Sequence, residues 1–442
     1  MPNLTHFTSG NRYSACILLL FLIVLCLLPA CRDHSTGPEP VPSIQLDVDY
    51  RGTDFVWLKL SVEETVKDLH YLIRRNNEDR FTGQFSGRDT LITDTSLTPG
   101  TEYYYTVYGI KNSEPVDSGD TVPVTTLPLS SHDFHWEIDT LGEYGSMLRD
   151  VFAFSENDVW VVGEIITNVH TGDKSNAAHW DGTKWELHKI DLNPPMYYIL
   201  GFSQDDLWMV SGIPHHWDGM NWSKYHLWDM GVLSPNDGIL TKVWGTSSTN
   251  LYFVGDKGTI VHYDGSQYRR MESGTDADLK DIDGVYDPET GQTRIWVAGS
   301  GVLLYSEGET WEVVWDFDHP FFKDNYNNPN TVWVPDRKGF IVSVWGGSNS
   351  GTYLLNQQNP HQHTSLFNHD LFSFDMHGNS INDFFIVGDW NKVYHYNGST
   401  VRNYPELSLD GYSFGIYHFN NHVFVAGATG SSFRAVVFRG VR

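Results

Sequence analysis

One pattern of strands and turns repeats along the carboxyl-terminal two thirds of the chain. In each unit an apolar, aromatic-rich segment such as Asp158–Gly163 precedes a second apolar segment and a turn dipeptide such as Asp181-Gly182. The dipeptide recurs as Asp218-Gly219, Asp264-Gly265 and Asn397-Gly398. Asp-Gly and Asn-Gly pairs supply the positive φ values of a two-residue hairpin turn, and the flanking β-branched and aromatic residues favour strands. The repeat therefore predicts a succession of antiparallel hairpins.

The units are about 40–45 residues long with four short strands each, which is typical of a β-propeller. We count seven units between residues 131 and 442. The fifth is degenerate, and we place its strands at Thr331–Val334, Phe340–Val344, Thr352–Leu355 and Thr364–Phe367. The seventh has only three strands after the sixth unit. The segment Phe134–Asp139 resembles the fourth strands of other units, so we expect it to complete the seventh and close the ring.

The first thirty residues have the organisation of an export signal. A polar segment with the single charge of Arg12 precedes the apolar run Cys16–Leu28, which is shorter than the ~20 residues of a spanning helix. Leu28-Pro29-Ala30-Cys31 resembles the lipobox of bacterial lipoproteins, with an unusual proline before the small residue. The resemblance implies a signal peptide at 1–30 and a lipid anchor on Cys31. A retained helical anchor and an ordinary cleaved signal are the alternatives.

The cysteines agree with lipidation. The chain has three, Cys16, Cys26 and Cys31, and cleavage before Cys31 removes the other two. The mature chain then has no intramolecular disulfide to form. We expect a location in the cell envelope, with the membrane contacted through the lipid. Because Arg32 rather than an aspartate follows the cysteine, we favour the outer membrane or the cell surface over the inner membrane.

Residues 31–42 form a Pro-rich polar tether, and residues 43–127 predict a small β-sandwich. Ile44–Val48 alternates as a half-buried strand does. Leu97–Tyr103 resembles the segment that leads into the sixth strand of fibronectin type III domains, which makes Tyr103 the tyrosine whose hydroxyl bonds back to the backbone. Trp57 lies earlier in its strand than the core tryptophan of that family. It either takes that role by a register change, or the sandwich is only fibronectin-like.

The formal net charge is −26, from 29 basic and 55 acidic residues. Such a charge repels nucleic acid and anionic lipid, so we expect no nucleic-acid partner. Aromatic residues make up 14% of the chain, with 16 tryptophans. Aromatic side chains suit both strands and recognition surfaces, so composition favours a binding protein without identifying the ligand.

The repeats resemble those of bacterial propellers related to the sialidase-type Asp-box (BNR-type) proteins. Val243–Gly255 matches best, and Ser306–Trp311 is close to an Asp-box. Together with the fibronectin-like segment and the count of units, the resemblance predicts an all-β protein, a fibronectin type III-like sandwich followed by a seven-bladed β-propeller. It does not imply activity, because propellers host enzymes, scaffolds and lectins. The arginine cluster and the Arg-Ile-Pro segment of sialidases do not appear, and neither do nucleophile-elbow, phosphate-loop or dinucleotide motifs.

Three aspartates are the candidate site residues in the channel. Asp150 and Asp375 lie ten residues before Trp160 and Phe385, and Asp281 matches Asp150 by its neighbours. The equivalent residues elsewhere are Tyr198, Lys242 and Phe414. Innermost strands line the channel of a propeller, so one interpretation is that the carboxylates meet there and hold Ca²⁺. Alternatively, each accepts a backbone amide or pairs with Arg149, Lys242 or Lys280, and we favour this interpretation.

Loop residues supply the remaining candidates. Trp228, Trp390, Tyr326 and Asp324 are expected to form a patch for a protein or glycan, or to pack locally. His361, His363 and His369 lie in a loop that has no thiol or carboxylate at the spacing of a zinc site. The leading hypothesis is an exported, membrane-anchored binding or scaffold lipoprotein. The alternative is a carbohydrate-active enzyme, a glycoside hydrolase or lyase with carboxylates at the channel mouth.

Overall fold

The structure is a computed structural model that describes residues 43–442, except 64–68, 86, 112–113, 191–194, 317, 320–327, 348–349, 362 and 431–432. The predicted signal at 1–30, Cys31 and the tether lie outside the described residues. Residues from Pro42 to Arg442 form one compact unit. The described part of the chain contains no helix with the length and hydropathy needed to cross a membrane.

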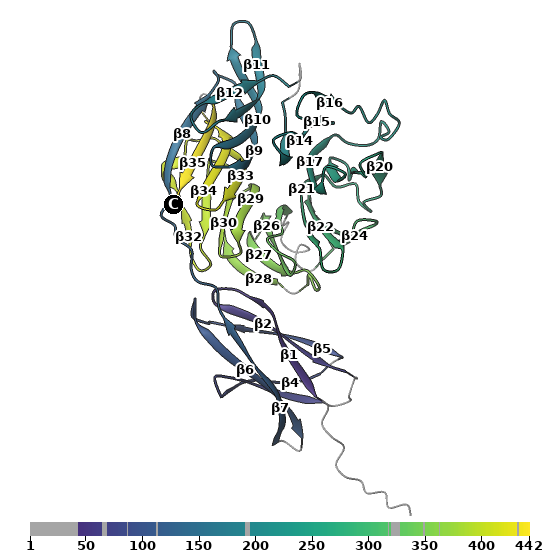
Figure 1. Ribbon diagram of the computed structural model, residues 1–442, viewed down its shortest axis with the longest axis vertical. Coiled ribbons are helices and arrows are strands. Elements are labelled where there is room, and N and C mark those ends of the chain that lie inside the picture. Colours follow the sequence, from purple (N-terminus) through teal and green to yellow (C-terminus); the bar gives the residue numbers. More distant parts are fainter. Residues whose placement is uncertain are drawn as a thin grey trace, which may run out of the picture. The chain divides into compact units, whose positions relative to one another are not determined.

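The amino-terminal strands form two antiparallel sheets (Figure 1). The strand order is β1-β2-β5 in one sheet and β4-β3-β6-β7 in the other. Their bounds are β1 (Ile44–Arg51), β2 (Phe55–Val62), β3 (His70–Arg75), β4 (Glu78–Gln84), β5 (Asp89–Thr95), β6 (Glu102–Lys111) and β7 (Glu114–Thr125). The two-sheet arrangement follows from alternation of apolar and polar residues, which leaves one face of each sheet to be buried.

Two aromatic residues singled out in the sequence have defined contacts. The hydroxyl of Tyr103 accepts a hydrogen bond from the backbone amide of Thr98 at 2.9 Å, as the resemblance implies. Trp57 is fully buried and stacks at a tilt on Tyr50, with ring centroids 5.2 Å apart. It belongs to a buried cluster that also contains Trp333 and Phe384 from later strands. Trp57 therefore belongs to a core that includes residues of later sheets as well as residues of the two amino-terminal sheets.

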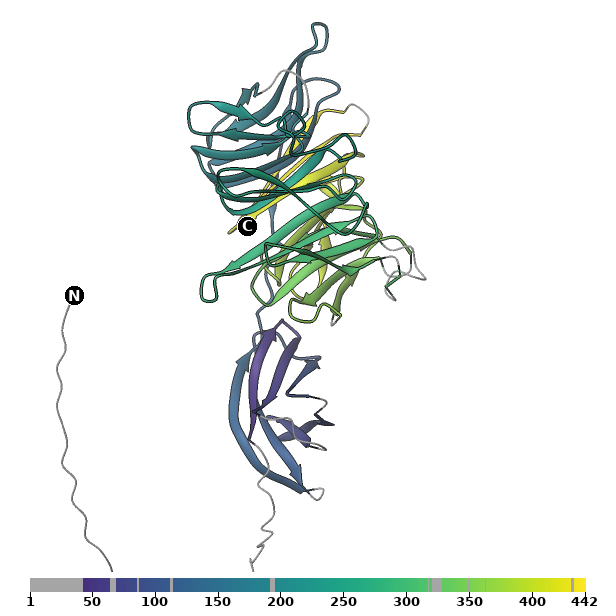
Figure 2. The same cartoon turned by 90° about the vertical axis from the view of Figure 1, so that its right-hand side faces the viewer.

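Seven four-stranded antiparallel sheets follow in the described residues, in the colour order of the chain (Figure 2). The first contains β9 (Met147–Ser155), β10 (Asp158–Asn168), β11 (Asp173–Trp180) and β12 (Trp185–His188). The second contains β13 (Tyr198–Ser203), β14 (Asp206–Val210), β15 (Pro214–Trp217) and β16 (Trp222–Lys224). The third contains β17 (Leu240–Ser247), β18 (Asn250–Gly255), β19 (Ile260–Tyr263) and β20 (Tyr268–Met271).

The fourth sheet contains β21 (Leu279–Asp287), β22 (Gln292–Gly299), β23 (Val302–Ser306) and β24 (Trp311–Trp315). The fifth contains β25 (Asn328–Trp333), β26 (Gly339–Trp345), β27 (Gly351–Asn356) and β28 (His363–Asn368), so the degenerate unit is a complete sheet. The sixth contains β29 (Ser373–Ser380), β30 (Asp383–Gly388), β31 (Val393–Tyr396) and β32 (Val401–Asn403), followed by a 3₁₀ helix at Pro405–Leu407. The last contains β33 (Tyr412–Phe419), β34 (His422–Ala428), β35 (Ala435–Val441) and β8 (His135–Leu141).

The first strands of the seven sheets make a closed circuit of contacts. Each of β9, β13, β17, β21, β25, β29 and β33 contacts the next, and β33 contacts β9. These strands therefore surround the axis, and the other strands of each sheet lie outside them. Buried residues of neighbouring sheets pack against one another, as in the cluster that joins Val243, Leu251 and Phe253 to Trp208. The core is thus distributed between sheets, so no sheet buries its faces alone.

The last sheet combines strands from both ends of the repeat region. β8 pairs antiparallel with β35, with Ile138 opposite Phe438. The expectation that the segment at 134–139 completes the seventh unit is confirmed by this pairing. Phe134, just before β8, is buried edge-to-face on Phe385, with centroids 5.1 Å apart. The pairing removes the open edges that β8 and β35 would otherwise expose.

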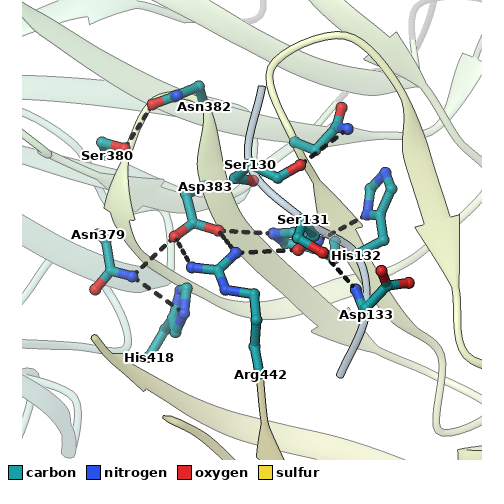
Figure 3. Close-up of polar contacts among 12 residues, drawn as sticks. Ser130, Ser131, His132, Asp133, Asn379, Ser380, Asn382, Asp383, His418 and Arg442 are labelled. Atoms are coloured by element: carbon teal, nitrogen blue, oxygen red, sulfur yellow. Dashed lines mark hydrogen bonds and ion pairs between the residues drawn. The ribbon is translucent and has the colours of Figure 1, made fainter. Parts of the chain in front are cut away.

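A polar cluster fastens the same junction (Figure 3). The guanidinium of Arg442 binds both carboxylate oxygens of Asp383, at 2.8 and 2.7 Å, and donates to the carbonyl of Ser131 at 3.0 Å. His395 also bonds Asp383, at 2.9 Å, and contacts His132 through their Nδ1 atoms at 2.8 Å. Asp383 is buried, and its hydrogen bonds to His395 and Arg442 hold its pKa far below the usual range despite the opposing effect of burial. Charge-assisted bonds of this kind are stronger than neutral ones.

Histidines recur at one position of the repeat as structural residues. In the third strands of four sheets, His179, His216, His262 and His395 each stack on an aromatic ring of the neighbouring strand. The Nε2 atom of each also bonds an aspartate or asparagine at the start of that strand, at 2.8–2.9 Å. Each histidine therefore makes its ring stacking and its Nε2 hydrogen bond within its own sheet. The four histidines do not converge on one ligand.

Burial of His418 predicts a measurable pH dependence. Burial lowers the pKa of His418 to about 3, so below its unfolded value of about 6.5 the unfolded chain binds the proton first. Stability is therefore full above pH ~6.5 and falls as the pH is lowered toward 4. We expect the difference in free energy of unfolding between the wild-type chain and His418→Phe to shrink by about 1.4 kcal/mol per pH unit over that interval. Denaturant unfolding at pH 7.5, 6, 5 and 4 measures it, with His170→Phe at an exposed position as control, and a constant difference contradicts the prediction.

Candidate functional site

The innermost strands surround a cavity of about 270 Å³. β9, β13, β17, β21, β25, β29 and β33 all contribute to its wall. The polar residues of the lining include Asp150, Tyr198, Lys242, Asp281, Asp283, Asp375 and His377. The structure therefore brings the three predicted aspartates together, with the predicted equivalents Tyr198 and Lys242 among them.

Lys242 is the centre of this cluster. Its ammonium lies 2.7 Å from Oδ1 of Asp281 and 3.0 Å from Oδ1 of Asp375. It also lies over the ring of Tyr198, 4.7 Å from the centroid. Lys242, Asp281 and Asp375 are buried, and Tyr198 is partly buried. One buried cation thus joins strands β13, β17, β21 and β29.

Each aspartate also fastens its strand to the next one around the axis. The Oδ2 atoms of Asp150, Asp281 and Asp375 accept the backbone amides of Ile199, Val332 and Ile416, each at 2.9 Å. The acceptor and the amide always belong to neighbouring sheets. Amide acceptance, one part of the favoured interpretation, therefore describes all three carboxylates, and pairing with Lys242 describes Asp281 and Asp375.

A second layer of the same kind was missed in the sequence. Asp283 accepts the amide of Val334 at 2.7 Å, and Nδ1 of His377 accepts the amide of His418 at 3.1 Å. Asp283 and His377 lie two residues after Asp281 and Asp375, on the same strand face. Period-two alternation is therefore the signal that would have found them.

Burial dominates the electrostatics of the cavity. It raises the pKa of Asp281 to about 6, partly offset by Lys242, and raises the pKa of Asp283 to about 7. Burial, and then the charge of Asp375, raises the pKa of Asp150 well above its usual range. For Lys242 burial lowers the pKa, but Asp281 and Asp375 outweigh it and the pKa is raised. The ammonium is retained because it neutralises buried carboxylates.

The structure corrects one equivalence. Phe414 was expected at the position of Asp150 and Asp375, but Gly415 is the residue that pairs with the second strand at that level, opposite Ala426. Phe414 lies on a β-bulge one residue earlier, as Arg149 and Phe374 do in their strands. Gly415 is required there, because a Cβ atom would lie 2.5 Å from Cα of Asp150.

The described residues contain no group of three or more histidine, cysteine, aspartate or glutamate side chains arranged to hold a metal ion. The ammonium of Lys242 lies between two of the carboxylates that were considered as calcium ligands. Those carboxylates therefore have a cationic partner within the chain itself.

Two of the four predicted loop residues, Trp228 and Trp390, lie in the described part of the chain. The indole nitrogen of Trp228 donates to the carbonyl of Ser234 at 3.1 Å, and its ring packs on a buried cluster. Trp390 is 62% exposed, in the turn between β30 and β31. Tyr326 and Asp324 lie outside the described residues. His369 bonds the hydroxyl of Thr352 at 3.0 Å, and His361 lies 3.3 Å from His319.

No protein-family model matches the chain, and no curated protein sequence matches it. Solved structures do. YCF48, in a structure described as bound to D1 peptide, is 14% identical with a TM-score of 0.51, over 71% of this chain and 99% of that chain. The WD40 beta propeller domain of Doa1 is 12% identical with a TM-score of 0.51, over 70% of this chain and 97% of that chain. At these identities the likeness shows the fold, which is a β-propeller.

Proposed function

We propose that this β-propeller is the recognition domain of an exported, lipid-anchored protein and that it binds another protein. The proposal rests on a contrast between the central cavity and the outer surface. The ionisable groups of the central cavity are engaged with one another and with backbone amides, whereas large aromatic side chains remain exposed outside it. Exposed tryptophan and tyrosine are enriched where proteins bind proteins. YCF48, which has the same fold, is described as bound to a peptide.

In this proposal the seven sheets are the blades of one ring closed by β8, and the amino-terminal strands are a fibronectin type III-like spacer. The strand order of the two small sheets and the hydroxyl bond of Tyr103 support the second assignment. The Pro-rich tether and the spacer would carry the propeller away from the bilayer, at the outer membrane or the cell surface.

The lipid on Cys31 has a direct test. We expect the full-length chain, expressed in a bacterium that processes lipoproteins, to incorporate labelled palmitate and to sediment with membranes. Cys31→Ser should lose the label and move to the soluble fraction, because one residue carries the lipid. The matched control is Cys26→Ser, which should retain both properties. A Cys31→Ser chain that still sediments after carbonate washing favours the retained helical anchor.

The alternative function, glycoside cleavage or elimination, needs two carboxyl groups free to act on a bound sugar. Asp150, Asp281 and Asp375 each accept a backbone amide, and two of them also bind Lys242. The oxygens of carboxylates held in this way are already used in hydrogen bonds and ion pairs that stabilise the fold. The alternative therefore stays second.

One binding experiment separates the two functions. The chain from residue 31 onward, with Cys31→Ser, is applied to arrays of extended peptides and of glycans and is mixed with a panel of chromogenic glycosides. We expect saturable binding to a subset of peptides, with Kd values of about 1–100 μM for short segments, and no release of chromophore. Glycoside turnover that disappears in a single carboxylate variant such as Asp281→Asn would instead establish the enzyme.

A further inference from the structure

A row of aromatic rings crosses three sheets at one end of the central channel. Trp345 ends β26, Phe372 and Phe374 flank the start of β29, and Tyr412 and Phe414 begin β33. In each antiparallel sheet the start of the first strand lies beside the end of the second, so these residues share one end of the channel. We call this row the aromatic ladder.

The rings of the ladder are in continuous contact. Successive centroids are 5.1 Å apart from Trp345 to Phe372, 5.3 Å from Phe372 to Phe374, and 4.8 Å from Phe374 to Phe414. Tyr412 stacks on Phe414 at 5.6 Å. Trp345 and Tyr412 are 39% and 40% exposed, and the three phenylalanines are partly exposed. Adjoining rings that remain open to solvent form a recognition surface rather than core.

Arg149 lies at one end of the aromatic ladder, in β9, the first strand of the first sheet. Its guanidinium lies over the ring of Phe414, 4.6 Å from the centroid. Among the described residues it has no hydrogen-bond acceptor and no ion-pair partner, although it is more buried than exposed. Burial lowers the pKa of Arg149, and the nearby Tyr197 and Glu164 offset this effect only in part. A guanidinium has donors arranged to bind a carboxylate through two parallel hydrogen bonds.

Trp390 provides an independent indication at the same end. It lies in the tight turn after β30, next to the bridge between Asp389 and Tyr412. Its φ is 58°, in the left-handed region where glycine and asparagine are favoured, and it is 62% exposed. A bulky residue kept in a costly conformation, with its ring in solvent, is typical of a functional surface rather than of packing.

The charge of the whole chain restricts the occupant. With a net charge of −26 the protein repels polyanions, so a polymer with a carboxylate on every unit is disfavoured. One carboxylate on an otherwise apolar segment avoids this repulsion and matches one unpaired guanidinium at the end of an aromatic row.

We propose that the aromatic ladder and Arg149 bind an extended polypeptide segment of another protein, in which one acidic residue follows aromatic or proline residues. The inference rests on the proposed protein-binding function and specifies its site and ligand. The aromatic and proline side chains lie on the rings from Trp345 to Phe414, and the carboxylate is held by the guanidinium of Arg149. Trp390 borders the segment on the side of the turn after β30.

The test uses the chain from residue 31 with Cys31→Ser and a library of fluorescein-labelled eight-residue peptides. Each contains aromatic or proline residues followed by aspartate, and each has a partner with asparagine instead. Fluorescence polarisation gives the Kd for each pair. We expect the aspartate peptides to bind about tenfold more tightly than the asparagine peptides, as removal of one charged contact at a partly buried arginine predicts.

Variants then locate the site. Arg149→Gln should weaken the aspartate peptide about tenfold and abolish the difference within each pair, and Arg149→Lys should restore only part of it. Trp345→Ala and Tyr412→Ala should each weaken both members of a pair. The control is Tyr286→Ala, an aromatic that is 49% exposed at the other end of an innermost strand, which should change neither. Circular dichroism and thermal unfolding identify any variant that is misfolded.

The outcomes distinguish the inference from the proposed function. Peptides that bind with no effect of Arg149 or ladder variants overturn the inference and leave protein binding in place. If no peptide binds and uronate oligosaccharides do, with loss in Arg149→Gln, the site is right but the polypeptide ligand is wrong. If neither class binds, both proposals fail.

Discussion

Replacement of Lys242 by methionine is expected to lower the free energy of unfolding by about 3–5 kcal/mol. Methionine keeps most of the volume but removes the ammonium that lies 2.7 Å from Asp281 and 3.0 Å from Asp375. Both carboxylates are buried, so they lose their cationic partner without gaining water. An unpaired buried charge costs much more than a surface charge. Urea unfolding followed by tryptophan fluorescence measures the loss.

Two further variants make this prediction specific. Lys280→Met removes a cation from an exposed pair with Asp278, which is worth at most about 1 kcal/mol. The triple variant Lys242→Met, Asp281→Asn, Asp375→Asn should recover much of the stability, because neutral amides do not need a cation. Recovery would show that charge, rather than packing, is responsible. A loss below about 1 kcal/mol for Lys242→Met would mean that the carboxylates are neutral in the folded protein.

Removal of β8 is expected to lower the melting temperature by roughly 10 °C or more. In this variant a Gly-Ser segment of equal length replaces residues 131–140, so the connection is kept. β35 then loses six of its seven residue pairs with β8, all but that of Ala435 with Leu141, and Arg439 loses its bonds to Glu137 and Asp139, each at 2.7 Å. Phe134 no longer covers Phe385. The exposed edge of β35 should also make the variant associate, which light scattering detects.

Complementation tests whether pairing is the cause. A synthetic peptide of residues 131–141 added to the variant should raise its melting temperature in proportion to occupancy, since it binds only the folded chain. A peptide of the same composition in scrambled order should have no effect. Unchanged thermal stability of the variant would show that the last sheet does not depend on β8.

The architecture was accessible from sequence because its signals are local and repeated. Turn dipeptides and alternating apolar residues predicted the hairpins, and the likeness of Phe134–Asp139 to fourth strands predicted the partner of β35. The aspartates at the channel were accessible for the same reason. Their use was not, because Lys242 meets Asp375 across the ring, 133 residues away, and only the fold sets that distance.

The misplacement of Phe414 has a specific physical cause. Counting ten residues back from the second strand works for the first and sixth sheets because their hairpins contain an extra bulge, at Asp158/Val159 and at Gly378/Ser380. The hairpin of β33 and β34 is regular from Ile416 to Phe419. The same count therefore ends one residue early there. Bulges change register without a strong composition signal, so sequence periodicity misses them.

The pairing of β8 with β35 also sets an order of events during synthesis. Asp139 and Arg439, which bond across these strands, are 300 residues apart in the chain. β8 therefore leaves the ribosome long before its partner, and it remains an unpaired edge for that time. Contacts of such separation form late and slowly. Interruption of synthesis before β35 should leave an open ring with two unpaired strand edges that can associate with other chains. Folding of this protein should therefore depend on chaperones that cover strand edges more than its final stability indicates.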